Sequence, residues 1–476
     1  MTNISKFRRT KIICTIGPAT SSANNLRALM LAGMNIGRLN FSHGDHESHC
    51  ETIRMIRKIS KELNIEVGIL QDLAGPKIRL GKLSVPELIV QADETINLGL
   101  VNDENPLRIP VNYPHFIEDV SIGDRILLAD GRVELQVESK HDNYLSAKVI
   151  VGGALHSHKG VNLPTSSLRI PSFTEKDRED LTVGIKEGVD FVALSFVRHE
   201  KDLEPVREIL NKQEQGPMLI AKIEKPQAVG RLTEILKNID GLMVARGDLG
   251  VEMPLEDVPM VQKRIIHEAR AAGKPVITAT QMLRSMMENP RPTRAEATDV
   301  ANAILDGTDA LMLSDETAIG EYPLEAVKIL NRIAKSTEPY LTDRLFAEKP
   351  VSGITQSIEL SIGRSACSIA EDLNASAIVA GTYSGSTARL ISRFRPASPI
   401  LGLTPNLQTV RQLSLSWGVI PDLVAPFSEV DDIFNLAVSW SSEKQISKQG
   451  DRIVVTAGVP SGKPGTTNLL KVLEIA

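Results

Sequence analysis

The sequence has few of the features that mark exported, membrane-bound or disulfide-rich proteins. Its 476 residues include only three cysteines, which are scattered, provide no disulfide framework and are typical of a reducing compartment. No apolar run reaches the length needed to cross a membrane. The basic residues at the start lead directly into a brief apolar run that is typical of a strand and not of a signal peptide. We therefore expect a cytoplasmic protein without a membrane partner.

The charge pattern and the missing motifs exclude further classes. Lys and Arg number 54 against 59 Asp and Glu, a formal charge of −5, and no long basic block favours a nucleic-acid partner. The sequence contains no GxxxxGK[ST], HExxH, GxSxG or CxxC motif, which argues against a P-loop nucleotidase, a zincin, a serine hydrolase and a thioredoxin-like enzyme. The length suggests about three domains, taking roughly 150 residues for each.

Short apolar runs that alternate with amphipathic helical stretches are the main repeating pattern. Such alternation predicts a parallel sheet, and eight units are what a closed (β/α)8 TIM barrel needs. The eight runs cover 11–17, 35–41, 67–73, 190–196, 218–224, 241–248, 275–281 and 310–316. We therefore predict an α/β fold built on a TIM barrel.

Nearly every one of these runs becomes polar at its carboxyl end. In a barrel these ends meet at one mouth. Residues two apart share a face of a strand, so the inserts Lys222-Ile-Glu224 and Arg246-Gly-Asp248 should each direct a cation and a carboxylate into the mouth. The other polar endings are Arg38, Asn40, Ser42, Asp72, Ser195, Thr278, Thr280 and Ser314–Glu316.

Two carboxylates at the ends of successive strands suggest a metal site. Glu224 and Asp248 could share one hard cation whose other positions are filled by water and substrate oxygens, as is usual for Mg²⁺. Alternatively, Lys222, Glu224, Arg246 and Asp248 form a salt-bridge network. In that case removal of Glu224 would harm folding and not catalysis.

Oxygen-bearing side chains near the second and third strands suggest a further ion site. Asn40, Ser42 and Asp72 suit a bound cation, and Arg38 suits a phosphate. Asparagine and serine are equally common as turn residues. We also expect Thr278 and Thr280 to face alike, with Thr280 able to bind a substrate carboxylate or relay a proton.

The barrel pattern is interrupted between its third strand and the helix at 174–187. Residues 77–170 read as short alternating strands, and Asp130-Gly131 is a hairpin signal. The insertion leaves and re-enters at a strand's carboxyl end, so it should act as a lid over the mouth. We expect a barrel domain over 1–76 and 171–342, a β-rich lid domain over 77–170 and a third domain over 343–476.

The third domain begins a second α/β series. Its strands are predicted at 376–385, 399–404, 451–459 and 468–475. The loop at 384–387 should open a helix carrying Arg389, Arg393 and Arg395, and a second Gly/Thr-rich loop spans 461–467. Helix starts bind phosphate readily, although serine and threonine are also ordinary helix caps.

A group of motifs distributed along nearly the whole chain resembles the pyruvate kinase family. The motifs are NFSHG, GPKIR, KGVNLP, AKIE, MVARGDLGVE, ATQML, PRPTRAEATDVANA and MLSDETA. The resemblance implies a barrel interrupted by a β-barrel domain, a C-terminal effector domain and usually a homotetramer. It also implies the glycolytic transfer of phosphate from phosphoenolpyruvate to ADP. The alternatives are a Mg²⁺-dependent barrel lyase or aldolase and a non-catalytic sugar-phosphate sensor.

The resemblance also implies roles for individual residues. Lys222 would stabilise the transition state, Glu224 and Asp248 would hold Mg²⁺, and Thr280 or an ordered water would assist protonation of the product. The positions matching phosphoenolpyruvate contacts are Arg38, Gly247, Asp248 and Thr280. Those matching nucleotide contacts are Arg79, Lys159 and His43. Those matching the monovalent-cation site are Asn40, Ser42, Asp72 and Leu73, and those matching the effector loop are Thr382, Ser384, Ser386 and Thr387.

The sequence departs from the family pattern in three places. Members that need K⁺ commonly have Thr-Lys-Gly-Pro-Glu where this chain has Leu73-Ala-Gly-Pro-Lys77. We hypothesise that the Lys77 ammonium replaces K⁺. Asp315 stands where glycine is common and adds charge near the mouth. The segment 459–468 lacks the animal-type Trp-Arg loop, so a sugar monophosphate or AMP is at least as suitable an effector as fructose 1,6-bisphosphate.

Overall fold

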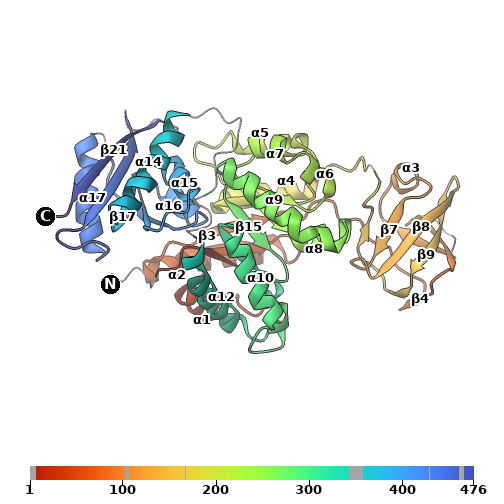
Figure 1. The fold of residues 1–476 in the computed structure, drawn as a ribbon. Helices are drawn as coiled ribbons and strands as arrows, with labels where there is room; N and C mark the ends of the chain where they lie inside the picture. Colours follow the sequence, from red (N-terminus) through yellow and green to blue (C-terminus); the bar gives the residue numbers. More distant parts are fainter. Residues whose placement is uncertain are drawn as a thin grey trace.

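The computed structural model arranges the chain in three lobes along one long axis (Figure 1). The barrel lies in the middle, the inserted sheet domain at one end and the C-terminal lobe at the other. The structure describes residues 7–101, 105, 107–166, 168–341, 357–427, 429–459 and 466–476. The expected boundary at 342–343 lies outside these ranges. No helix in the described ranges is long and apolar enough to span a membrane.

The central lobe is a closed parallel barrel with strand order β1-β16-β15-β14-β13-β12-β3-β2. All eight predicted runs are confirmed as strands of this barrel, and each strand stops within or just before its polar ending. The strands are β1 Lys11–Thr15, β2 Ile36–Asn40, β3 Gly68–Asp72, β12 Phe191–Leu194, β13 Met218–Ile223, β14 Gly241–Ala245, β15 Val276–Ala279 and β16 Ala310–Leu313.

Alternation along the strands produces two apolar layers. One set of side chains, including Ile13, Leu70 and Ile277, fills the barrel interior, and the alternate set packs beneath the outer helices. This double burial explains why the strands read as continuous apolar runs. The larger covering helices are α1 Ala23–Ala32, α2 His46–Leu63, α4 Glu175–Glu187, α9 Val258–Ala271, α10 Arg294–Leu305 and α12 Pro323–Thr337.

The insertion forms a six-stranded sheet in the order β11-β7-β8-β9-β5-β6, with a separate pair β10-β4. Isolated bridges join Arg79 to Gly160 beside one edge strand and Leu80 to Val111 in the other, so the 79–80 segment links the two edges. The predicted hairpin at Asp130-Gly131 connects β7 to β8 with positive φ values. The strands are β4 Leu88–Val90, β5 Thr95–Leu100, β6 Arg108–Val111, β7 Arg125–Leu128, β8 Val133–Lys140, β9 Tyr144–Val151, β10 Gly153–Leu155 and β11 Val161–Asn162.

The C-terminal lobe is a five-stranded sheet in the order β19-β18-β17-β20-β21, with β21 antiparallel. The four predicted strands are present. The sequence pattern missed β19, whose Pro421 and Asp422 interrupt its apolar character. The strands are β17 Ala377–Gly381, β18 Ile400–Thr404, β19 Val419–Leu423, β20 Arg452–Gly458 and β21 Thr467–Glu474, and the helices are α14 Ile358–Asp372, α15 Ser386–Ser392, α16 Leu407–Leu413 and α17 Val430–Glu443.

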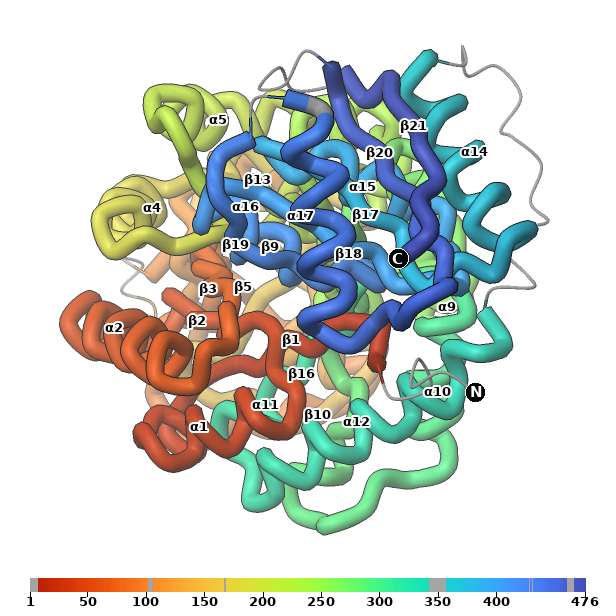
Figure 2. The backbone as a smooth tube through the Cα atoms, turned by 90° about the vertical axis from the view of Figure 1, so that its left-hand side faces the viewer, coloured from red at the N-terminus to blue at the C-terminus, as the bar shows by residue number. Residues whose placement is uncertain are grey.

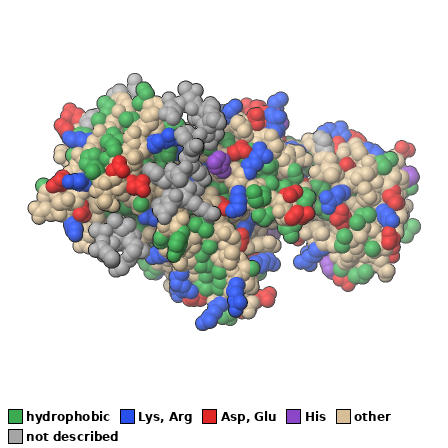
Figure 3. All heavy atoms as spheres, viewed as in Figure 1, with side chains coloured by type: hydrophobic (Ala, Val, Ile, Leu, Met, Phe, Trp, Pro, Cys, Tyr) green, Lys and Arg blue, Asp and Glu red, His purple; other side chains and the backbone are tan. Residues whose placement is uncertain are grey.

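The C-terminal lobe packs against the amino ends of the barrel strands, opposite to the mouth. Figure 2 shows its sheet and helices in front of the barrel. Lys11, the first residue of β1, donates to the carbonyl of Val419 at 2.6 Å, and Arg395 pairs with Asp309, which directly precedes β16. Basic and acidic side chains are interspersed over the face of the molecule shown in Figure 3.

Candidate active site

Lys222 lies at the centre of a group of polar side chains at the barrel mouth. Its Nζ is 2.8 Å from Glu224 Oε1 and 3.3 Å from Asp72 Oδ1. It also donates to Ser195 Oγ at 2.8 Å. These residues lie in or directly after β13, β3 and β12, so the predicted convergence is confirmed. The side chain is only 13% exposed. The ammonium is therefore mostly surrounded by protein atoms, although it lies near the solvent.

Charge pairing keeps this lysine protonated. Burial alone would lower the pKa of Lys222, but the carboxylates of Asp72 and Glu224 outweigh burial and raise it. For Asp72, burial acts to raise the pKa, and the cations of Lys222 and Arg38 overcome that effect and lower it. The mouth therefore presents a fixed positive charge held between two carboxylates.

Glu224 and Asp248 have the donor chemistry for a divalent cation. Glu224 is 1% exposed, and its Oε2 accepts a 2.7 Å hydrogen bond from the amide of Phe196. Burial raises the pKa of Glu224 to about 7, Lys222 opposes this shift and the charge of Asp248 adds to it. Asp248 is exposed. No group of three or more metal-binding side chains occurs in the described part of the chain, so a cation here needs water and substrate oxygens.

Arg246 and Asp248 do not share a strand face, and that expectation was wrong. β14 ends at Ala245 and α8 (Arg246–Glu252) begins immediately, so both residues lie in the first turn of a helix. Arg246 pairs with Asp299 at 2.7 Å, not with Asp248. The alternative four-residue salt-bridge network is therefore reduced to its Lys222–Glu224 half.

Arg246 instead holds the segment that carries Thr280. Its Nη2 donates to the carbonyl of Thr280 at 2.8 Å. Thr280 has φ 75°, and a Cβ at Gly247 would lie 2.7 Å from its Cγ2, so only glycine allows this approach. The expected common face of Thr278 and Thr280 was wrong, because β15 ends at Ala279 and the buried Thr278 hydroxyl bonds to Thr308 at 3.0 Å.

Arg38 completes the positive side of the mouth. Its Nε donates to Asp72 Oδ2 at 2.7 Å and its Nη1 to Thr15 Oγ1 at 2.9 Å, which fixes the guanidinium. Asp72 Oδ1 is buried and lies 3.3 Å from Lys222 Nζ. The lysine ammonium therefore already stands beside the oxygen that the predicted monovalent-cation site would use.

The other oxygens predicted for a monovalent cation have local partners. Asn40 Oδ1 accepts from the amide of Ser42 at 3.2 Å, as a turn residue does. The carbonyl of Leu73 accepts from Ser195 Oγ at 2.7 Å. Lys77 is exposed and lines a hollow between the barrel and the insert, together with Asp248.

The lining of this hollow includes residues of both the insert and the barrel mouth. Asn162 of β11 lines it and donates to Glu252 Oε1 of α8 at 2.8 Å. The same oxygen is 2.5 Å from Lys225 Nζ, a buried pair that the sequence pattern did not reveal. Of the predicted nucleotide contacts, Arg79 donates to the carbonyl of His158 at 2.9 Å. Lys159 and His43 are exposed.

The predicted effector loop lies far from the mouth in the C-terminal lobe. Ser384 Oγ is 3.2 Å from Ser386 Oγ, and the buried Thr387 hydroxyl is 2.8 Å from that of Thr467. Thr382 is buried. The loop at 461–465 lies outside the described residues. Arg395 does not extend from the helix as expected, because α15 ends at Ser392.

A (β/α)8 barrel whose mouth holds a lysine between carboxylates, beside an inserted sheet domain, defines a barrel enzyme that binds cations and anions together. Comparison with family models identifies which family of barrel enzymes this is. "Pyruvate kinase, barrel domain" matches residues 7–327 and "Pyruvate kinase, alpha/beta domain" matches residues 361–473. The chain belongs to the pyruvate kinase family.

Individual relatives agree. Pyruvate kinase of Staphylococcus epidermidis is 47% identical over 469 residues, covering 98% of this chain and 80% of the relative. That of Geobacillus stearothermophilus is 46% identical over 480 residues, with 98% and 81% covered. A crystal structure of a pyruvate kinase from Cryptosporidium parvum superposes with a TM-score of 0.93 at 36% identity, covering 100% of this chain and 98% of that one.

Proposed function

We propose that the barrel mouth is where this enzyme transfers the phosphoryl group of phosphoenolpyruvate to ADP, giving pyruvate and ATP. The observation that carries this assignment is the position of Lys222 Nζ, 2.8 Å from Glu224 Oε1 and 3.3 Å from Asp72 Oδ1. Phosphoryl transfer needs positioning and charge neutralisation more than covalent help from the protein. A fixed ammonium within a partly desolvated site supplies that neutralisation.

The basic and acidic residues of the mouth have different proposed roles. Lys222 and Arg38 face the transferred group and the substrate, and Glu224 with Asp248 would hold Mg²⁺, which supplies further charge neutralisation when bound. Arg246 positions Thr280 through its carbonyl. After transfer the enol product is protonated at carbon, a step that Thr280 or an ordered water assists.

The insert provides the nucleotide side of the site. Arg79, Lys159 and His43 are the proposed phosphate contacts, and Asn162 links the insert to α8 through Glu252. We propose that closure of the domain over 77–170 excludes water from the phosphoryl group. The barrel domain over 1–76 and 171–342 and the effector domain over 343–476 complete the arrangement.

The proposal also covers the effector site, the oligomeric state and the localisation of the enzyme. A phosphorylated effector would bind Thr382, Ser384, Ser386 and Thr387 in a cytoplasmic homotetramer. Because Thr387 is buried against Thr467, the exposed side of this loop is formed mainly by the two serines.

Replacement of Glu224 by Gln tests the metal assignment. We expect the Mg²⁺ concentration for half-maximal activity to rise by more than the roughly tenfold that loss of an outer-shell partner costs. The reason is that a neutral amide is a poorer ligand for a hard cation. Pyruvate release is followed with ADP present and with ADP omitted, since transfer to ADP requires the nucleotide and a lyase does not.

Glu316→Gln is the matched control, because it also removes a buried carboxylate at a strand end. Glu316 accepts from the amides of Leu283 and Ser314, so its loss should lower the melting temperature without changing the Mg²⁺ requirement. If Glu224→Gln lowered the melting temperature and left the Mg²⁺ requirement unchanged, Glu224 would be a structural residue.

The Lys77 hypothesis predicts activity without K⁺. Lys77 is exposed and lines the same hollow as Asp248. In buffer free of Na⁺ and K⁺, with an organic cation as counterion, we expect turnover without saturable activation by added K⁺. Lys77→Glu should introduce K⁺ activation. Strong, saturable activation of the unmodified enzyme would show that Lys77 does not replace the ion.

A further inference from the structure

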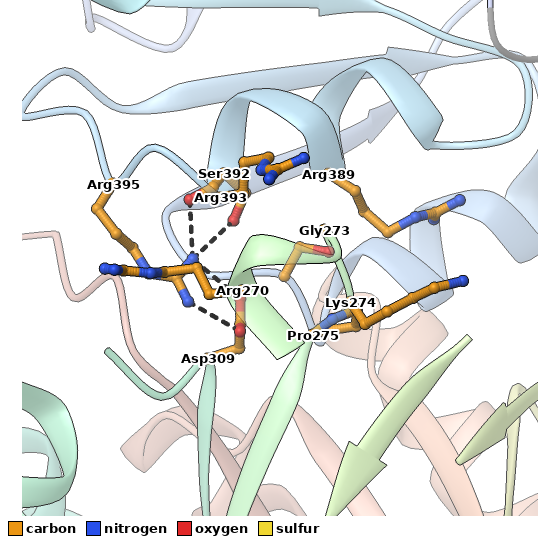
Figure 4. Close-up of a pocket in the computed structure, with 10 residues that line it drawn as sticks. Arg270, Gly273, Lys274, Pro275, Asp309, Arg389, Ser392, Arg393 and Arg395 are labelled. Carbon is orange, nitrogen blue, oxygen red and sulfur yellow. Dashed lines mark hydrogen bonds and ion pairs between the residues drawn. The ribbon is translucent and has the colours of Figure 1, made fainter. Parts of the chain in front are cut away.

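Cationic side chains line a second hollow, at the junction between the barrel and the C-terminal lobe (Figure 4). It opens to solvent. Lys274 reaches it from the turn before β15, and Arg389 and Arg393 reach it from α15 and its end. Lys274 and Arg389 are close enough that their like charges interact.

Within the described residues, the hydrogen bonds that these three cations donate go to backbone carbonyls. Lys274 donates to Ile239 at 2.6 Å, Arg389 donates to Ser384 at 2.8 Å, and Arg393 donates to Ala271. Burial lowers the pKa of all three side chains. Carbonyl dipoles offset a desolvated cation less completely than a carboxylate does.

The nearby carboxylates are already paired. Asp309 binds Arg395 at 2.8 Å and Asp240 binds Arg207 at 2.8 Å. The lining also contains buried polar atoms without a hydrogen-bond partner in the described residues, namely Arg389 Nη1, Arg395 Nε and Ser416 Oγ. The hollow therefore has an excess of positive charge and of polar atoms that lack a partner within the described residues.

We propose that this junction hollow, formed by Lys274, Arg389 and Arg393 with Ser416, binds a small inorganic oxyanion such as phosphate. The anion accepts hydrogen bonds from both lobes and neutralises cations that the protein leaves without carboxylate partners. The site is separate from the mouth, and it adjoins the proposed effector loop at 382–387 through the hydrogen bond from Arg389 to the carbonyl of Ser384.

The proposed anion site lies between an element that leads to the active site and an element that leads from the proposed effector loop. Lys274 precedes β15, which ends next to Thr280 at the mouth. Arg389 lies on α15, which begins at Ser386 in the proposed effector loop. An anion held by both side chains therefore ties the strand leading to the active site to the helix leading from that loop.

Titration calorimetry with sodium phosphate, at constant ionic strength in chloride buffer, tests the proposal on the full-length enzyme. We expect binding to weaken by about tenfold or more in Lys274→Met and in Arg393→Met, since each variant removes a charged hydrogen-bond donor worth roughly 1.5–3 kcal/mol. Arg411→Met is the matched control. It removes a cation at the same junction that already has a carboxylate partner, Glu66 at 3.0 Å, and should bind phosphate as the unmodified enzyme does.

Crystals of the unmodified enzyme soaked in selenate provide a test that needs no variant. We expect an anomalous peak between Lys274 and Arg393. Equal phosphate binding by all four proteins, or loss of binding only in Ser386→Ala, would overturn the proposal. So would selenate peaks confined to the mouth and the 382–387 loop.

Discussion

Replacing Lys222 with Met should lower kcat by about a thousandfold or more, since removal of one preorganised donor to developing charge already costs 10²–10³-fold. Lys222 contributes a full charge in addition to its hydrogen bonds. Its ammonium contacts Ser195, Glu224 and Asp72, so the donor is held in place before substrate arrives. The measurement is steady-state pyruvate formation with saturating phosphoenolpyruvate, ADP and Mg²⁺.

Loss of a buried cation also affects folding, so the control must separate the two effects. Lys222→Met leaves Glu224 without its ion-pair partner, and breaking a buried pair costs about 3–5 kcal/mol. Lys222→Arg keeps the positive charge but replaces a compact ammonium by a planar guanidinium. We expect its melting temperature to stay near that of the unmodified enzyme while kcat remains low. A kcat for Lys222→Met within tenfold of the unmodified value would remove Lys222 from the mechanism.

The barrel was predictable because its signal repeats. Eight apolar runs, each buried on both faces and each ending in polar residues, allow little other than a closed parallel sheet. The contact between Lys222 and Glu224 also followed from local geometry, because β13 remains extended almost to the carboxylate. Residues two apart then share a face whatever the rest of the fold does.

The rule that residues two apart share a face gave a wrong prediction for Arg246 and Asp248, which follow the next strand. β14 ends at Ala245 and a helix begins at once, so Arg246 and Asp248 lie about 200° apart around a helix axis of 3.6 residues per turn. The prediction that Thr278 and Thr280 face alike was wrong for a similar reason, because the left-handed backbone of Thr280 ends the alternation of side chains along β15. A period of two can be read from a sequence, but the residue at which it stops depends on tertiary packing.

Long-range ion pairs were the least predictable part of the molecule. The partners Lys225 and Glu252 are 27 positions apart, and Arg395 and Asp309 are 86 positions apart. Nothing in the local sequence distinguishes Arg395 from Arg389 or Arg393, all of which were expected on one helix. The fold separates them, because only Arg395 turns into the barrel and becomes 1% exposed.

That burial makes the Arg395–Asp309 pair a sensitive point for stability. Arg395 Nη2 is 2.8 Å from Asp309 Oδ2, with the side chains 1% and 5% exposed. Asp309 also accepts from the amides of Val276 and Trp417. Arg395→Met would leave a buried carboxylate without its cation, at a cost of about 3–5 kcal/mol. We expect the melting temperature to fall by about 3–5 °C, since the unfolding entropy of a chain of 476 residues is roughly 1 kcal/mol/K.

Two further variants identify the pair as the cause. Arg27→Met breaks an exposed pair with Glu62, whose side chains are 40% and 41% exposed, and should cost less than about 1 kcal/mol. Arg395→Met combined with Asp309→Asn removes both charges. The Asn side chain keeps one of the two acceptor oxygens that the amides of Val276 and Trp417 use, so the double variant should recover part of the lost stability. Differential scanning calorimetry measures all three. Equal melting temperatures for Arg395→Met and Arg27→Met would mean that the junction between the two lobes does not depend on this pair.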